Sequence, residues 1–522
     1  MASQQKKSDY ERFRVIAANR PEFFPVEQSL PPDYYKPIAP WMGRLILPAK
    51  EQRQAIQGVL FEVHHAPVEF QYLVGNVVIL RFSNRPDTSA YVNAATQDLN
   101  FSAQAEKGTK DGLVLPTRLD HWRLVTPLES LAGAHPTDDV IVALPNSTIV
   151  IDSLHGNRSQ NSLQALMIDR EPMQITGRYY ALVKFAEPVQ GNGEKNRCKV
   201  VHFNKASRRF DGLEEKVSVP EVPRNTNATR ASVVMGIEDT DLNQFGWYIY
   251  GVQDESGTFV VRAIAPRKLL TAEPERIVTG EAAAEKYATK EVWAHIKKKK
   301  GTVRSTLLKP TASVASTGSN TWIEGQQALL IHVYGGVGGQ KAEPAAKAPF
   351  YFGHFAYGTA EVVREPLTGD LRFEIVYHQI YTHNSEGLIA GSLHWSRYMG
   401  DRTFGILGLR PVVDTLFKLD EFTGDYGGQG WNRSPLDRMM YELQIMAARY
   451  RIGDGTGVTF VGPANNCAQD ANQALYAALR YIAQAIRQDP NVENWKQQHP
   501  EQAIRLYRLE QLTEDFKHVL LP

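Results

Sequence analysis

The first half of the chain alternates short apolar runs with turn residues. Runs such as GVLFEVHH, RYYALVKF, FGWYIYGV and GTFVVRAI are rich in β-branched and aromatic residues, and Asp211-Gly212 is one of the turn dipeptides between them. This pattern is typical of short antiparallel strands joined by tight turns. It predicts tandem small antiparallel β-barrel or sandwich modules, one at 46–172 and one or more at 173–272.

Two segments flank these modules. Residues 1–45 carry many prolines among aromatics, which predicts an extended arm lying on a folded body. Residues 273–320 combine a helix-forming stretch, GEAAAEKYATKEVWAHIKKKK, with the small polar linker PTASVASTGSNT. We expect a helix that ends in lysines, which suit its dipole, and a main domain boundary at 310–321.

The last segment, 321–522, starts with strands and ends with helices. QALLIHVY, FYFGHFAYGTAEVV and LRFEIVYHQIYTHN are strand patterns, and the last two read as a hairpin. Ser434 and Pro435 open one helix, a second runs from near Asn466 to about Arg487, and a third covers roughly 500–519. The predicted fold class is therefore multidomain α+β, with β modules followed by an α+β domain.

Cys467 is the strongest candidate for a reactive side chain. The sequence VTFVGPANNCAQD predicts a strand, a tight loop and a helix with Asn466 as N-cap and Cys467 as first residue. Backbone N–H groups and the helix dipole there are expected to lower the pKa of a thiol. The alternative is an ordinary small buried residue, since free cysteines are often buried.

His354 is the candidate base for Cys467, or else a core histidine satisfied by a backbone carbonyl. If Thr368-Gly369 are the central residues of the hairpin turn, His354 faces His383; with a loop two residues longer, it faces Tyr381. In both registers the odd-numbered residues share the His354 face, because side chains alternate. We expect His383 first and Gln379 second to orient the imidazole, or both only to satisfy backbone groups.

Two resemblances follow from these motifs. With GHFAYG and NNCAQD, residues of about 321–522 resemble a circularly permuted NlpC-type papain-like domain. That resemblance implies the order His354, a polar residue from Gln379, Tyr381 or His383, then Cys467. The stretches LDHWRLVTPLESLAGAHPTDDVIVALP, FGWYIYGVQDESGTFVVRAIAPR and HWSRYMGD resemble cyanobacterial-type proteins labelled Abi (CAAX) family protease. Because the chain lacks E-E-x-x-x-R, a cysteine hydrolase is preferred over a membrane metalloprotease.

Composition also limits the classes of partner, location and cofactor that we expect. Among 522 residues, 58 Lys+Arg balance 57 Asp+Glu, which argues against a nucleic-acid partner. We find no apolar stretch near the length of a membrane span and no secretory leader, so a soluble cytoplasmic protein is expected. Two cysteines and no H-E-x-x-H or nucleotide-loop pattern predict no cofactor and no metal.

The sequence thus predicts a soluble cysteine hydrolase acting on a peptide or amide through Cys467 and His354, with acyl transfer as a variant. The alternative is a non-enzymatic scaffold that binds a protein partner through the N-terminal β modules and carries a degenerate papain-like domain.

Overall fold

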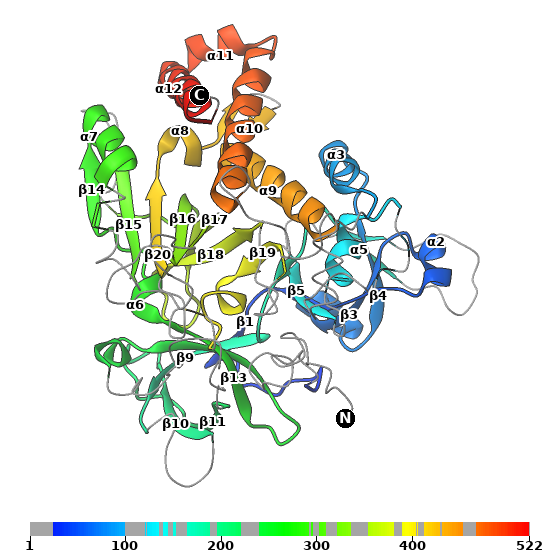
Figure 1. Ribbon diagram of the computed structural model, residues 1–522. Coiled ribbons are helices and arrows are strands. Elements are labelled where there is room, and N and C mark those ends of the chain that lie inside the picture. Colours follow the sequence, from blue (N-terminus) through cyan, green and yellow to red (C-terminus); the bar gives the residue numbers. More distant parts are fainter. Residues whose placement is uncertain are drawn as a thin grey trace, which may run out of the picture.

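The computed structural model describes a mixed α+β protein with large β-sheets and a C-terminal helical region (Figure 1). The described residues are 24–99, 119, 121, 123–134, 139–144, 150–152, 164–187, 196–220, 240–291, 294–295, 302–309, 321–335, 353–380, 389–402, 405, 412–428, 431–452 and 466–520. Their strands form a 14-stranded sheet, a 6-stranded sheet and a 2-stranded ribbon. None of the helices among these residues is long and apolar enough to cross a membrane.

The N-terminal half of the 14-stranded sheet has the strand order β8-β5-β2-β3-β4-β7-β6. Its strands are β2 (Trp41–Ile46), β3 (Val59–His65), β4 (Val77–Phe82), β5 (Val140–Leu144), β6 (Val150–Asp152), β7 (Ala165–Ile168) and β8 (Met173–Gln174). The helical segments are η1 (Lys50–Gln52), α2 (Arg53–Ile56), η2 (Val68–Leu73), α3 (Pro86–Ala95) and α5 (Pro127–Ala132). Strands were predicted here, but a barrel or sandwich is wrong, because β8 pairs onward with β19 and the sheet stays open.

The 6-stranded sheet closes on itself. Its strands are β1 (Tyr35–Pro37), β9 (Tyr179–Phe185), β10 (Arg197–His202), β11 (Glu214–Ser218), β12 (Trp247–Gln253) and β13 (Phe259–Pro266), with η4 (Asp241–Gln244) before β12. The order β9-β10-β11-β13-β12 returns to β9 through the β9–β12 pairing, so these strands form a small barrel. One or more barrel or sandwich modules were predicted for 173–272; the five strands that close the barrel, β9 to β13, lie within that range, whereas β1 lies outside it.

The described part of the N-terminal arm lies on this barrel, as the prolines and aromatics predicted. β1 pairs with β9, and the buried guanidinium of Arg178 donates hydrogen bonds to the carbonyl oxygens of Pro25 (2.6 Å) and Val26 (3.1 Å). The predicted arm also includes 41–45, which belongs instead to the N-terminal sheet as part of β2. Residues 1–23 of the arm lie outside the described residues.

The C-terminal half of the large sheet has the order β14-β15-β20-β16-β17-β18-β19. Its strands are β14 (Arg276–Thr279), β15 (Thr302–Lys309), β16 (Gln327–Gly335), β17 (Gly353–Arg364), β18 (Leu371–Gln379), β19 (Gly391–His394) and β20 (Val412–Lys418); the ribbon is β21 (Tyr426–Gly428) and β22 (Trp431–Arg433). β14 and β15 were expected as helix and linker. Since β15 pairs in parallel with β20, the sheet begins before the boundary expected at 310–321.

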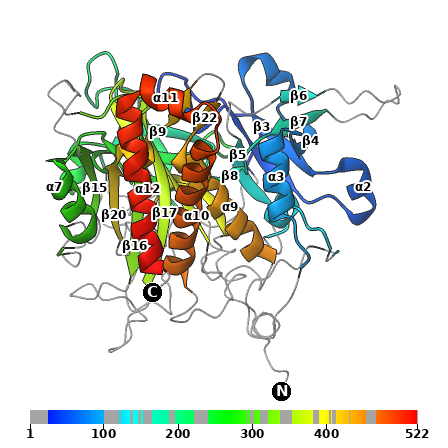
Figure 2. The ribbon, with the colours of Figure 1, turned by 90° about the horizontal axis from the view of Figure 1, so that it is seen from above.

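Helices cover one face of this half of the sheet (Figure 2). They are α8 (Asp420–Thr423), α9 (Pro435–Ile452), α10 (Cys467–Arg487), α11 (Val492–Gln498) and α12 (Pro500–Leu520). The helix expected from 280 is found as α7 (Glu281–Lys286), which continues as the π-helix η5 (Tyr287–Glu291). The lysine run lies outside the described residues. The remaining short helices are α6 (Arg267–Leu270) and η8 (Trp395–Arg397).

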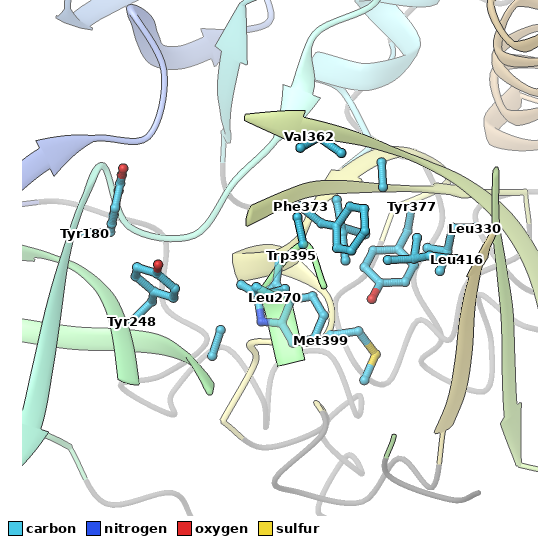
Figure 3. Close-up of a cluster of buried hydrophobic side chains, with 14 of the residues drawn as sticks. Tyr180, Tyr248, Leu270, Leu330, Val362, Phe373, Tyr377, Trp395, Met399 and Leu416 are labelled. Carbon is cyan, nitrogen blue, oxygen red and sulfur yellow. The ribbon is translucent and has the colours of Figure 1, made fainter. Parts of the chain in front are cut away.

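The opposite face of the sheet packs on the barrel. Figure 3 shows Tyr180 and Tyr248 from barrel strands on one side of this core, and Phe373 and Tyr377 of β18 on the other. Leu330 of β16 belongs to the same buried cluster. Side chains alternate between the two sheet faces, so the odd-numbered residues Leu329 and Ile331 pack instead with α10. This half of the sheet therefore separates two cores, one facing the barrel and one beneath the helices.

Candidate functional site

The helix that carries Cys467 starts where the sequence predicted. Asn466 has an extended backbone, and its side chain accepts a hydrogen bond from the Gln469 N–H at 3.0 Å. This satisfies one of the N–H groups that a helix start leaves without an intrahelical partner. Cys467 is then the first helical residue, and it is partly exposed.

The thiol of Cys467 contacts the backbone of β17. The N–H of Phe355 donates to Cys467 Sγ at 3.4 Å, and the Tyr357 hydroxyl donates to Asn472 Oδ1 of α10 at 2.7 Å. The Phe355 nitrogen is about 2.4 Å from the His354 Cα, so the sulfur lies within about 6 Å of that Cα. Cys467 and His354, far apart in sequence, therefore lie close together.

The pKa of the Cys467 thiol differs from the sequence-based expectation. Burial raises this pKa, and the nearby Asp470 carboxylate raises it further. The N–H groups of Phe355, Ala468 and Cys467 act in the expected direction and lower it, but they do not outweigh burial. The pKa of this thiol is therefore raised, whereas the helix start alone was expected to lower it.

Gln379 holds His354, as the shared face of the hairpin strands predicted. Gln379 Oε1 is hydrogen-bonded to His354 Nε2. β17 and β18 pair in the longer-loop register, with Tyr357 opposite His378, so the Thr368-Gly369 two-residue turn is wrong. Tyr381 and His383, the other two candidates, lie outside the described part of the chain.

His378 points to the other face of the sheet, as the alternation of side chains requires. Its Nδ1 lies 3.1 Å from Ser392 Oγ, and its Nε2 lies 3.4 Å from Thr359 Oγ1. His378 is therefore separated from the His354 side chain by the sheet.

The same alternation separates the side chains of His354 and Phe355. Phe355 packs with the core beneath α10, whereas the His354 ring lies 6.3 Å from the ring of His332 on the barrel side. Cys467 approaches from the helix side and reaches the backbone of β17 itself. This contact lies on β17 beyond Tyr357, the last residue of β17 at this end for which a pairing with β18 is described.

A buried polar cluster next to His354 was missed at the sequence level. His332 Nδ1 lies 2.6 Å from Asp414 Oδ1 and His332 Nε2 lies 3.0 Å from the Tyr398 hydroxyl, while the Tyr377 hydroxyl donates to Asp414 Oδ2 at 2.7 Å. All four side chains are buried. The available signal was Asp414 within the apolar run PVVDTLF, because a charge in such a strand needs a partner.

The site offers donors for a developing negative charge. Gln379 is buried, and its Nε2 has no hydrogen-bond partner in the described structure. The first turn of α10 adds backbone N–H groups beside the sulfur. Within the described ranges, no group of three or more His, Cys, Asp or Glu side chains is arranged to hold a metal ion.

Comparisons with known proteins return no relative. No protein-family model matches the chain, and neither the curated proteins nor the solved structures contain a significant match. The function is therefore inferred from the geometry of the site.

Proposed function

We propose that the protein is a thiol-dependent acyl hydrolase in which Cys467 is the nucleophile and His354 the base. The observation that supports this most is the position of the Cys467 sulfur on the N–H of Phe355, the residue that follows His354. The order His354, Gln379, Cys467 is also the order that the resemblance to permuted papain-like hydrolases implies.

The raised pKa of the thiol determines when its proton would leave during the reaction. Since burial raises the thiol pKa, the proton must leave as the bond forms, and a base is needed in the same step. The Gln379 carbonyl oxygen favours the tautomer of His354 that carries its proton on Nε2, which makes Nδ1 the basic nitrogen.

The proposed steps use only these groups. Sγ attacks the carbonyl carbon of an amide or ester while His354 accepts the thiol proton, and the carbonyl oxygen becomes an oxyanion near Gln379 Nε2 and the α10 N–H groups. The oxyanion collapses, and the leaving amine or alcohol takes the proton from His354. Water then attacks the thioester with His354 as base, releasing the carboxylic acid and restoring the thiol. A second nucleophile in place of water would give acyl transfer.

Acylation by a simple aryl ester tests the proposal without knowledge of the natural substrate. The protein would carry Cys198→Ser so that Cys467 is the sole thiol, and p-nitrophenyl acetate would be the acyl donor. We expect acetylation of Cys467, detected by peptide mass spectrometry, and a loss of rate of about 10²-fold or more on His354→Ala. His499→Ala, at a partly exposed histidine of the helical region, is the matched control and should leave the rate unchanged.

Two results would contradict the proposal. One is acetylation of Cys467 at the rate of a free thiol, unaffected by His354→Ala. The other is an equal effect of His354→Ala and His499→Ala. Either result would make the Cys467 site a structural contact between α10 and β17.

A binding scaffold is the second candidate, and the barrel topology favours it. The strand order first-second-third-fifth-fourth, with β11 and β13 parallel, is that of the oligonucleotide- and oligosaccharide-binding (OB) fold. In that fold, ligands use the outer face of the second and third strands. Here β10 and β11 present Arg197, Lys199 and Lys216, and Lys199 pairs with Glu214 at 2.6 Å. Neither strand carries a Phe, Tyr or Trp for base stacking, which favours a protein or sugar ligand over nucleic acid. Failure of Cys467 acylation, with the fold intact, would favour this candidate.

A further inference from the structure

The segment 271–275 links α6 to β14 and bridges two distant strands of the C-terminal half-sheet. The Ala272 N–H donates to the Leu371 carbonyl of β18 at 3.1 Å, and the Glu275 N–H donates to the Ser305 carbonyl of β15 at 3.0 Å. The strands β20, β16 and β17 separate β15 from β18 in the sheet order. Figure 1 shows α6 between this half of the sheet and the barrel. Both ends of the segment are therefore fixed to the sheet.

The segment lines a cavity of about 140 Å³ whose inner end is apolar. Phe373 and Leu416 line this cavity, and both are almost completely buried in the core between the sheet and the barrel (Figure 3). Leu269 of α6 and Pro274 add further apolar surface. An apolar cavity of roughly this volume can hold a group of the size of a benzene ring. The inner end is therefore large enough for a branched aliphatic or a phenyl group.

The mouth of the cavity carries two positive and two negative side chains. Lys268 Nζ lies 3.5 Å from Glu273 Oε2, and Arg304 Nε lies 3.0 Å from Glu275 Oε2. All four residues line the cavity, and between 28% and 72% of each side chain is exposed. Ion pairs as exposed as these contribute little to stability, so a bound ligand can replace either partner at low cost.

Ser305 fixes the two acidic residues at this mouth. Its hydroxyl donates to the Glu273 carbonyl at 2.6 Å, and its own carbonyl accepts from the Glu275 N–H. Arg304, the preceding residue of β15, is thereby held beside both of them. The walls of the cavity are formed by backbone that is already hydrogen-bonded, so a ligand does not have to order them when it binds.

We propose that this cavity binds a free α-amino acid with an apolar side chain, such as leucine or phenylalanine. The side chain fills the apolar inner end, where it is removed from water. The α-carboxylate binds the guanidinium of Arg304, and the α-ammonium group binds the carboxylate of Glu273 or Glu275. A zwitterion matches both signs of charge at the mouth, whereas a ligand with a single charge matches only one. Neither Cys467 nor His354 lines this cavity, so the proposal does not depend on the proposed acyl hydrolysis.

Calorimetric titration of the full chain with L-leucine and L-phenylalanine tests the site. We expect binding to the wild type and about tenfold weaker binding to Arg304→Met, because the carboxylate loses its charged partner. Arg487→Met removes an exposed arginine that pairs with Glu510 in the helical region; it is the matched control and should bind like the wild type. Leu269→Trp should abolish binding by filling the cavity. If Leu269→Trp loses its fold, Arg304→Met at the exposed mouth still decides the outcome.

Three ligand analogues test the chemical class. N-acetyl-L-leucine lacks the ammonium group and L-leucinamide lacks the carboxylate, so each should bind about tenfold more weakly than L-leucine. Glycine lacks the apolar side chain and should show no binding. The proposal would be overturned if neither L-leucine nor L-phenylalanine bound the wild type at concentrations up to about 10 mM. Equal binding to the wild type and Arg304→Met, or binding of N-acetyl-L-leucine as tight as that of L-leucine, would also overturn it.

Discussion

Cys467 and Cys198 occupy two different surroundings, and these determine how each thiol behaves. Cys198 lies inside the barrel with 1% of its surface exposed, next to Val200 and Val217. Cys467 is partly exposed at a helix start, where backbone donors and burial act on its pKa in opposite directions. The start of a helix therefore does not by itself give a thiol a low pKa, because burial destabilises the charged thiolate.

Alkylation of Cys467 should be slow at neutral pH. Because burial raises the pKa of this thiol, the reactive thiolate forms only at higher pH than in a free cysteine, whose pKa is about 8.5. In a Cys198→Ser protein, the rate of iodoacetamide labelling should reach half its maximum above that value. Free cysteine in the same solution is the control. Fast labelling at pH 6 would mean that the helix start outweighs burial.

His378 should make the native state sensitive to mild acid. Burial, aided by Arg170, lowers its pKa from 6.5 to about 4. Between pH 6.5 and 4, His378 is protonated in the unfolded chain but stays neutral in the native state. The contribution of His378 to the free energy of unfolding is therefore complete above pH 6.5. It is lost as the pH falls towards 4, by up to about 1.4 kcal/mol per pH unit.

Urea unfolding at several pH values between 7 and 4 measures this effect. His378→Gln should give a shallower loss of stability in this window than the wild type, whereas His499→Gln, at a partly exposed histidine, should give the wild-type slope. Parallel slopes for the wild type and His378→Gln would show that His378 is protonated in the native state.

At the scale of elements, the sequence predicted those features that depend on neighbouring residues, such as helix starts and the alternation of side chains along a strand. The start of α10 followed from Asn466 and the start of α9 from Ser434, whose Oγ accepts from the Asp437 N–H at 3.2 Å. The alternation along β17 and β18 placed Gln379 beside His354. By contrast, the pairing of β15 with β20 and the contact between His332 and Asp414 join distant segments, and no nearby residue specifies them.

The N-cap of α10 should contribute measurably to stability. Asn466→Ala leaves the Gln469 N–H without its partner and should lower the free energy of unfolding by about 1 kcal/mol. Asn466→Asp keeps an acceptor at the same position and should stay close to the wild type. Chemical denaturation of both variants measures the difference, and equal losses would show that the side-chain cap contributes nothing.

At the scale of the whole molecule, a buried cluster joins the two halves of the large sheet. The halves pair only where Leu393 of β19 meets Gln174 of β8 among the described strands. Close to that point, Arg451 of α9 binds Glu171 through two hydrogen bonds of 2.9 and 3.0 Å and donates to the Ala390 carbonyl at 2.7 Å. The helix that covers the C-terminal half is thereby tied to the segment leading into β8.

Gly391 is part of the same arrangement. Its φ of 146° is one that L side chains rarely adopt, and a Cβ there would lie 3.1 Å from Glu171 Oε1 and 3.2 Å from Arg451 Nη1. The first residue of β19 is therefore fixed as glycine both by its backbone and by the ion pair beside it. The Ser130 hydroxyl, 3.0 Å from Arg451 Nε, brings α5 into the cluster as well.

Removing one partner of this pair should destabilise the whole molecule. Both side chains are fully buried, so Arg451→Met leaves the Glu171 carboxylate as an unpaired buried charge, and the loss should be about 3–5 kcal/mol. The adjacent pair Arg170–Asp437 has the same chemistry at 2.9 Å but about half of each side chain exposed, so Arg170→Met should cost at most about 1 kcal/mol. The double variant Arg451→Met with Glu171→Met should be more stable than Arg451→Met alone, because no charge stays buried. Urea unfolding of the three variants measures these differences, and equal losses from Arg451→Met and Arg170→Met would show that the two halves are held together elsewhere.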